Sequence, residues 1–182
     1  ELTLTGRTYE DVLDAAAWAV FKSGYKDGYG ADGDHLKTKE EVDEALKYGM
    51  SMITLDCSLV LETVPSDAEE RRSRYEALPK DYRKELEASY LSDPEAVQLG
   101  IFFDQSLLEE TAVAYYKVVE LAEEVYRLIR KTNRQVDLEI SLDETLHTTK
   151  LAEHYFVACE LYKNRVVVNS LAPRFVGEFQ KA

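Results

Sequence analysis

The stretch MSMITLDCS, residues 50–58, decides the fold class of this 182-residue chain. Met50 to Leu55 form a short continuous apolar segment, and Asp56 follows it directly. A strand that is buried on both faces shows such a continuous segment instead of an alternation, and parallel sheets require burial of this kind. The stretch therefore predicts a strand of a parallel sheet with a carboxylate at its carboxyl end.

Helical patterns lie on both sides of this strand. Thr38 predicts the N-cap of a helix that runs through Tyr48 and is ended by Gly49. Thr8 predicts another N-cap, for a helix through Ser23. Its apolar stripe is Val12, Ala15, Ala16, Ala19 and Val20. Two further helices are predicted over residues 106–132 and 149–163, because their apolar residues recur in steps of three and four.

The remaining strands are predicted from apolar segments between these helices. They are an extended segment from Tyr25 to Ala31 ahead of the polar turn 32–37, a strand from Val136 to Leu142, and a strand opened by Val166 to Val168. Helix and strand thus alternate four times, which is typical of parallel strands joined by helical crossovers. We predict an α/β fold of parallel (β/α) repeats, an incomplete (β/α)8 TIM-type barrel, with a small open sheet as the alternative.

One segment breaks the alternation. Residues 62–105 contain three of the four prolines and short charged stretches, and we predict a helical insertion there. The chain as a whole, residues 1–182, is expected to be a single, partial barrel domain.

Composition excludes several classes of function. The chain has 35 acidic against 22 basic residues, a formal net charge of −13, which argues against nucleic acid as a partner. Neither a membrane span nor a signal peptide is recognisable. The two cysteines, Cys57 and Cys159, are expected to be reduced thiols of a cytoplasmic protein, and Cys57 a core residue instead of a nucleophile.

Polar side chains follow each predicted strand. Because parallel strands end at the same edge of a sheet, and ligands bind at that edge, we expect a lined pocket there. The residues concerned are Asp32, Asp34, His35, Lys37, Asp56, Ser58, Glu139, Ser141, Asp143, Glu144, Asn169 and Arg174.

Asp34, His35 and Lys37 lie within one short turn. A carboxylate, an imidazole and an amine so close together can supply metal ligands and a cation for an anionic substrate. In the alternative interpretation, Asp34 or Thr38 only caps the next helix while His35 and Lys37 face solvent.

Glu139 lies in the middle of a predicted strand, between Leu138 and Ile140. A buried unpaired carboxylate costs several kcal/mol, so Glu139 is expected to face the inside of a barrel, where it can be paired or bound. The alternative is an exposed edge strand on which Glu139 faces water.

Three strings make the chain resemble the tagaturonate/fructuronate epimerase family. They are GADGDHLKT at residues 30–38, together with ITLD at 53–56, and LAPRFVGEFQ at 171–180. The resemblance implies a metal-dependent (β/α)-barrel enzyme of hexuronate breakdown, of which this chain is the middle portion. It implies that Asp34 and His35 lie at a divalent metal of the zinc, manganese, nickel or cobalt class, and that Arg174, Glu178 and Gln180 bind a sugar acid.

The substrate class implied by the resemblance also suggests a mechanism. The two ketohexuronates differ one carbon beyond the carbon next to the ketone, so simple enolisation cannot interconvert them, whereas retro-aldol cleavage and re-addition can. We expect Asp56 or Glu139 to move the proton and Lys37 or Arg174 to bind the carboxylate. The alternatives are another metal-dependent sugar isomerase or aldolase, or an inactive half-barrel or binding domain. Oligomerisation with further copies is also expected to be possible.

Overall fold

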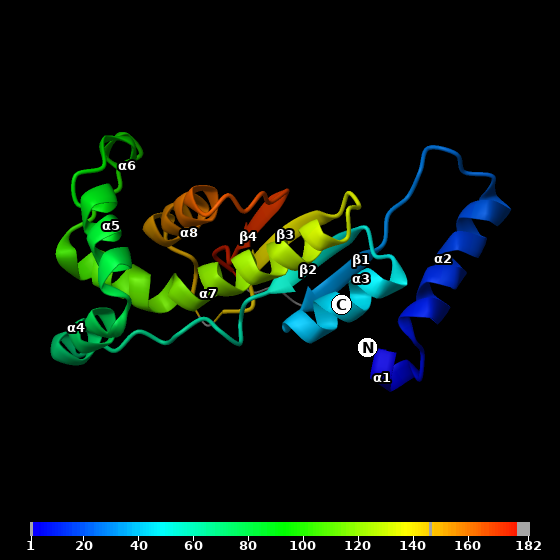
Figure 1. The fold of residues 1–182 in the computed structure, drawn as a ribbon, viewed down its shortest axis with the longest axis horizontal. Coiled ribbons are helices and arrows are strands. Elements are labelled where there is room, and N and C mark those ends of the chain that lie inside the picture. The colour runs from blue at the N-terminus through cyan, green and yellow to red at the C-terminus, as the bar shows by residue number, and fades with distance from the viewer. Residues whose placement is uncertain (1, 146, 178–182) are drawn as a thin grey trace.

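The structure, a computed structural model, describes residues 2–145 and 147–177. The elements in chain order are α1 (Leu2–Thr5), α2 (Tyr9–Ser23), β1 (Asp32–Leu36), α3 (Lys39–Tyr48), β2 (Met52–Asp56), α4 (Ala68–Ala77), α5 (Lys80–Tyr90), α6 (Pro94–Gln98), α7 (Gln105–Lys131), β3 (Asp137–Leu142), α8 (Leu151–Lys163) and β4 (Ser170–Pro173). The strands form one sheet in the order β1-β2-β3-β4, and every neighbouring pair is parallel (Figure 1). The prediction of a parallel α/β fold is confirmed.

The predicted helix boundaries are confirmed to within two residues, because local capping sets them. Thr8 and Thr38 each accept a hydrogen bond from the backbone N–H three residues on, and the carboxylates of Asp11 and Glu41 accept one from the backbone N–H of the cap residue. Gly49 ends α3 with φ of 96°, a left-handed conformation that glycine adopts without steric cost.

Three short helices fill the segment predicted as an insertion. α4, α5 and α6 lie between β2 and the long helix α7, at the opposite end of the molecule from α2 (Figure 1). Tyr75, Leu86 and Tyr90 anchor α4 and α5 in the hydrophobic core. None of the helices in the described part of the chain is long and apolar enough to cross a membrane.

One layer of helices covers one face of the sheet. The long α7 contacts α3 and also α8, so the three helices pack side by side. The sheet residues that form the core with them are Ile53, Leu55, Leu138, Ile140 and Leu142, all buried. Gly33 of β1 belongs to this face, and a Cβ there would come within 3.3 Å of Ala45 on α3. A larger residue at this position would require its neighbours to shift.

The opposite face of the sheet is polar. Strand neighbours at one level of this face are Thr54, Glu139 and Ser170, and Asp56 lies opposite Ser141 one step further along. Successive side chains of a strand point to opposite faces, so these residues share the side away from the core. The helices and the polar groups thus lie on different sides of the sheet.

Two strands were predicted at the wrong positions. β1 is not Tyr25–Ala31 but the polar segment Asp32–Leu36, because Gly33 and Leu36 supply its buried positions while its charged residues face away. β4 is Ser170–Pro173 instead of Val166–Val168. Val166 is buried in the core, but its N–H bonds back to Leu161 at the end of α8, so the valines form the connection.

The predicted apolar stripe of the first helix is not buried. Although α2 forms as expected, none of its residues is buried, and Trp18 and Phe21 are 60% and 77% exposed. α2 lies beside α3 at one end of the molecule, outside β1, and contacts the rest of the chain through one side only (Figure 1). The periodic pattern correctly predicted a helix, but it did not predict which neighbouring element would cover the apolar stripe of this helix.

Candidate active site

The predicted site residues within the described part of the chain lie in the strands or directly after them. Because the sheet is wholly parallel, the carboxyl ends of the strands meet at one edge. Asp34 and His35 lie in β1, Asp56 ends β2, and Glu139 lies within β3. Lys37 directly follows β1, and Arg174 directly follows β4. Glu178 and Gln180 lie outside the described residues.

Lys37 connects the ends of three strands. Its Nζ lies 2.9 Å from Asp56 Oδ2 and 3.4 Å from Glu144 Oε2, and it donates a hydrogen bond of 3.2 Å to Ser58 Oγ. Asp56 belongs to β2, Ser58 follows β2, and Glu144 follows β3. The ammonium is therefore held by carboxylates from two neighbouring strands. Lys37 is thus a paired lysine, although about a third of its side chain remains exposed to solvent.

Asp56 and Lys37 stabilise each other's charges. The Asp56 side chain is 1% exposed, and the backbone N–H of Ser58 donates to its Oδ1 at 2.8 Å. Burial alone would raise the pKa of Asp56, but the bonds from Lys37 and Ser58 outweigh it, and the pKa is lowered. Hydrogen bonding to Asp56 is also the main cause that raises the pKa of Lys37. At neutral pH the site therefore contains a carboxylate and an ammonium.

The end of β1 has an irregular backbone. His35 has φ of 54°, in the left-handed region, and the register to β2 shifts between Gly33 and Leu36. A bulge of this kind changes the direction of side chains, and bulges and strained residues concentrate near active sites. Gly33 and Leu36 can both face the core only because of this irregularity.

His35 lies between two carboxylates. Its Nδ1 is 2.7 Å from Asp34 Oδ1, and its Nε2 is 3.8 Å from Asp143 Oδ1. Desolvation acts to lower the pKa of His35, but the bond to Asp34 and the nearby carboxylates outweigh it, so the pKa is raised. Asp143 is itself fixed by Ser141 Oγ, which donates to it at 2.5 Å.

Glu139 lies on the polar face with a bonded partner. Ser170 Oγ on β4 donates a hydrogen bond to Glu139 Oε2, and Thr54 Oγ1 on β2 donates to Asp32 Oδ2 at 2.8 Å. Desolvation is the main cause that raises the pKa of Asp32, to which the charge of Glu139 contributes. β3 lies between β2 and β4 in the sheet. The alternative that Glu139 lies on an exposed edge strand is therefore wrong. Ser170 and Thr54 were not among the predicted site residues, although strand alternation places them beside Glu139.

The described residues do not assemble a metal site by themselves. No group of three or more His, Cys, Asp or Glu side chains within residues 2–145 and 147–177 is arranged to hold a metal ion. Asp34 and His35, the predicted ligands, are hydrogen-bonded to each other. His35 Nε2 and Asp143 Oδ1, 3.8 Å apart, form at most a pair of ligands. This donor set is too small for the coordination that a zinc-class ion requires.

Arg174 has a guanidinium that is free of carboxylates in the described part of the chain. Its Nη1 donates to the backbone oxygen of Asp143 at 3.1 Å, and no described carboxylate forms an ion pair with it. This distinguishes it from Lys37, which two carboxylates hold.

A cavity of about 530 Å³ adjoins Lys37. Ser58 and Glu144, two of the Lys37 partners, line it, together with residues of the β3–α8 connection and of α7. The connection contributes Thr145, His147, Thr148 and Lys150. A six-carbon sugar acid fits this volume.

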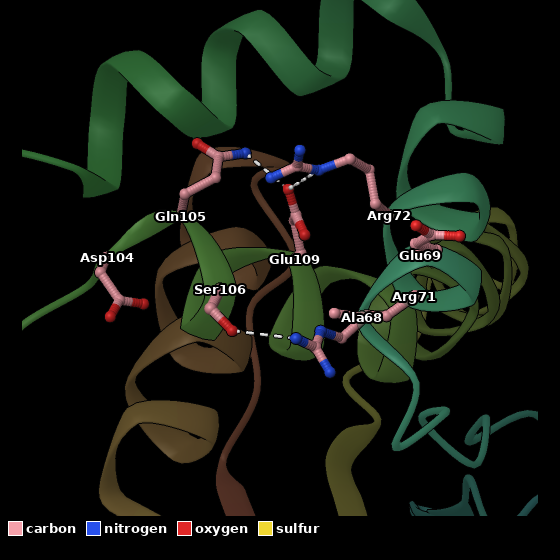
Figure 2. Close-up of a pocket in the computed structure, with 8 residues that line it drawn as sticks. All are labelled: Ala68, Glu69, Arg71, Arg72, Asp104, Gln105, Ser106 and Glu109. Carbon is pink, nitrogen blue, oxygen red and sulfur yellow. Dashed lines mark hydrogen bonds and ion pairs between the residues drawn. The ribbon is translucent and has the colours of Figure 1, made fainter.

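A second cavity, of about 440 Å³, lies far from the strand ends, between α4 and the start of α7 (Figure 2). Its polar groups bond to one another: Arg72 and Gln105 both donate to the buried Glu109, and Arg71 donates to Ser106. These bonds fix α4 on α7.

Cys57 is a core residue, as predicted. It is 1% exposed, both cysteines are free, and burial is the main cause that raises the pKa of its thiol to about 12. Such a thiol is not a nucleophile at neutral pH.

Comparison with known proteins places this geometry in a family. The family model of UxaE, tagaturonate epimerase, matches residues 1–182. A tagaturonate/fructuronate epimerase of Thermotoga maritima is 37% identical over 180 residues, which are 97% of this chain and 37% of that protein. The chain thus spans little more than a third of the length of this relative.

Solved structures that match this chain belong to the same kind of enzyme. The native crystal structure of the fructuronate-tagaturonate epimerase UxaE from Cohnella laeviribosi matches with a TM-score of 0.91 and 44% sequence identity. The match covers 99% of this chain and 38% of that one. A structure of the same enzyme complexed with one glycerol matches with a TM-score of 0.92.

Proposed function

The chain belongs to the tagaturonate epimerase family, and on this premise we propose that it forms part of an enzyme that interconverts tagaturonate and fructuronate. The observation that carries the proposal is the meeting of Lys37, Asp56 and Glu144 at one edge of a parallel sheet whose polar face holds Glu139. A charged edge of this kind beside a cavity suits a small anionic sugar.

The sheet suits part of a (β/α)8 barrel. The strand order follows the chain order, and a single helix layer covers one face while the other face is polar. In a barrel the polar face would be the inside and Glu139 would point there. Residues 1–182 would then form one partial barrel domain with its insertion at about 62–105.

The proposed reaction is a retro-aldol cleavage followed by re-addition. A base removes the proton of the hydroxyl on the carbon to be inverted, and the bond from this carbon to the one next to the ketone breaks. The bonding electrons pass to the ketone fragment as an enolate, and the other fragment becomes an aldehyde. The aldehyde turns its other face, the enolate re-adds to it, and the proton returns to the new alkoxide.

Glu139 is the better of the two candidates for this proton transfer. Asp56 is held as an anion by Lys37 and by Ser58, and its lowered pKa makes it a weak base. Glu139 is half-buried, and Ser170 Oγ donates a hydrogen bond to its carboxylate. A carboxylate on the polar face can accept and return the hydroxyl proton.

Lys37 and Arg174 take different roles in this proposal. The raised pKa of Lys37 keeps it charged, so it suits stabilisation of the enolate oxygen and not proton abstraction. Arg174 keeps N–H groups for a substrate carboxylate, which a guanidinium binds with two parallel hydrogen bonds. A bound carboxylate would retain the aldehyde fragment while it turns.

We keep the divalent ion as a separate proposal. His35, with Asp34 or Asp143, would supply two ligands, and the others would come from parts of the longer relatives that this chain does not span. No step of the proposed proton transfer is assigned to the ion. Metal content per protein, measured for the wild type and for His35→Ala, tests this expectation. A cytoplasmic location is likewise proposed, on the two free cysteines.

Product analysis tests the proposed function. The complete gene product that carries this chain should convert tagaturonate to fructuronate and the reverse, which chromatography or NMR resolves. Turnover of neutral ketoses instead of uronates would favour a sugar isomerase or aldolase. Absence of turnover on both, with the fold intact, would favour a binding domain.

A further inference from the structure

Arg174 is bonded to the β3–α8 connection at both its main chain and its side chain. Its backbone N–H donates to Thr149 Oγ1 at 2.9 Å, and the backbone N–H of Thr149 donates to the oxygen of Arg174 at 3.0 Å. Its Nη1 donates to the backbone oxygen of Asp143 at 3.1 Å. Thr149 and Asp143 lie at the two ends of the same connection.

These bonds take the place of the hydrogen bonds that a neighbouring β-strand would make to the main chain of Arg174. The last paired residue of β4 is Pro173, opposite Leu142, and Arg174 lies one residue beyond it. The neighbouring strand therefore does not fix the main chain at Arg174. Thr149 satisfies both backbone groups of Arg174 and so determines where the side chain starts.

We propose that Thr149 is a positioning residue that aims the Arg174 guanidinium at the carboxylate of a ketohexuronate. The proposal rests on the proposed function, in which Arg174 binds the substrate carboxylate. Thr148 and Lys150, which flank Thr149, line the cavity beside Lys37, so the same two bonds also fix the wall of this cavity. The substrate's carboxylate end thus lies toward β4 and its reacting carbons toward β2 and β3.

Two variants of Thr149 separate the hydroxyl from the shape of the side chain. Thr149→Val keeps the shape but removes the oxygen that accepts from Arg174, and Thr149→Ser keeps that oxygen. Loss of one such bond should raise the KM for tagaturonate about fivefold to tenfold. The kcat should stay within about twofold, because Thr149 touches no reacting atom. Thr149→Ser should restore the wild-type KM.

Arg174→Gln supplies the reference for a double-mutant cycle. If Thr149 acts through Arg174, adding Thr149→Val to Arg174→Gln should change the KM by less than about twofold. An equal effect of Thr149→Val in both backgrounds would overturn the proposal, as would a wild-type KM or a loss confined to kcat.

Calorimetry of tagaturonate binding distinguishes this proposal from the proposed function. A wild type that binds tagaturonate without converting it would reject the epimerase function, and the dissociation constants of the same variants would then decide on Thr149. A wild type that neither binds nor converts tagaturonate would overturn both.

Discussion

Lys37 Nζ lies 2.9 Å from Asp56 Oδ2, and this ion pair joins the ends of β1 and β2 at the proposed active site. The carboxylate is buried, whereas about a third of the Lys37 side chain is exposed. Solvent therefore reaches the pair from the Lys37 side and not from the Asp56 side.

Replacing Lys37 by Met should destabilise the fold and reduce activity. The change leaves a buried carboxylate without its cation, which costs about 3–5 kcal/mol in fully buried pairs and about 2 kcal/mol here, because Lys37 is partly exposed. Urea unfolding measures the loss. The variant Lys37→Met/Asp56→Leu should recover part of it, since no orphan charge remains. A Lys37→Met protein as stable as the wild type would contradict the proposed role of the pair.

Asp56 should make stability depend on pH on the acid side. Its pKa in the folded protein lies below the ordinary 3.8, so its stabilisation is present above the unfolded pKa and is lost as the pH falls through the folded pKa. Asp56→Asn should therefore lose less stability than the wild type between about pH 5 and pH 3. If the free energy of unfolding changed equally with pH in both proteins across this range, the assignment of this pH dependence to Asp56 would be contradicted.

Gly33→Ala should destabilise the packing of β1 on α3. The added Cβ would lie 2.8 Å from Leu36 Cδ1 and 3.1 Å from Ile53 Cδ1. Overpacking of this kind costs about 1–3 kcal/mol. Thermal unfolding measures the effect, and Leu36→Val in the same protein should relieve part of it. Equal melting temperatures for wild type and Gly33→Ala would show that the neighbours yield without cost.

Cys57 should be inert in the native protein. A thiol with a pKa near 12 and 1% exposure is protonated and inaccessible at neutral pH. Mass spectrometry after brief alkylation should find Cys57 unmodified, and denaturant should expose it. Cys57→Ala should keep the catalytic rate. Rapid native alkylation of Cys57 would contradict its placement in the core.

Sequence patterns predicted what local interactions determine. Thr38 and Gly49 mark the ends of α3 because capping involves only neighbouring residues. β1 was misplaced because its apolar content is only Gly33 and Leu36, too little for a periodic signal, and a bulge at His35 breaks the alternation. The exposure of Trp18 depends on distant neighbours, which periodicity does not describe.

In the candidate site, too, local features were predictable and long-range contacts were not. The residue types at the strand ends were predictable because parallel topology brings these ends together. The partners were not, because Glu144 bonds to Lys37 across 107 positions and Ser170 to Glu139 across 31. Such contacts depend on the register of β3 and β4, which no local pattern encodes.

The central claim is that Glu139, on the polar face of the sheet, moves the proton in the epimerisation. The direct measurement is the rate of tagaturonate conversion by Glu139→Gln in the complete gene product, with circular dichroism to verify the fold. We predict a loss of about 100-fold or more in kcat with an unchanged fold, because glutamine cannot accept the proton. A Glu139→Gln protein that turns over tagaturonate at the wild-type rate would contradict this account.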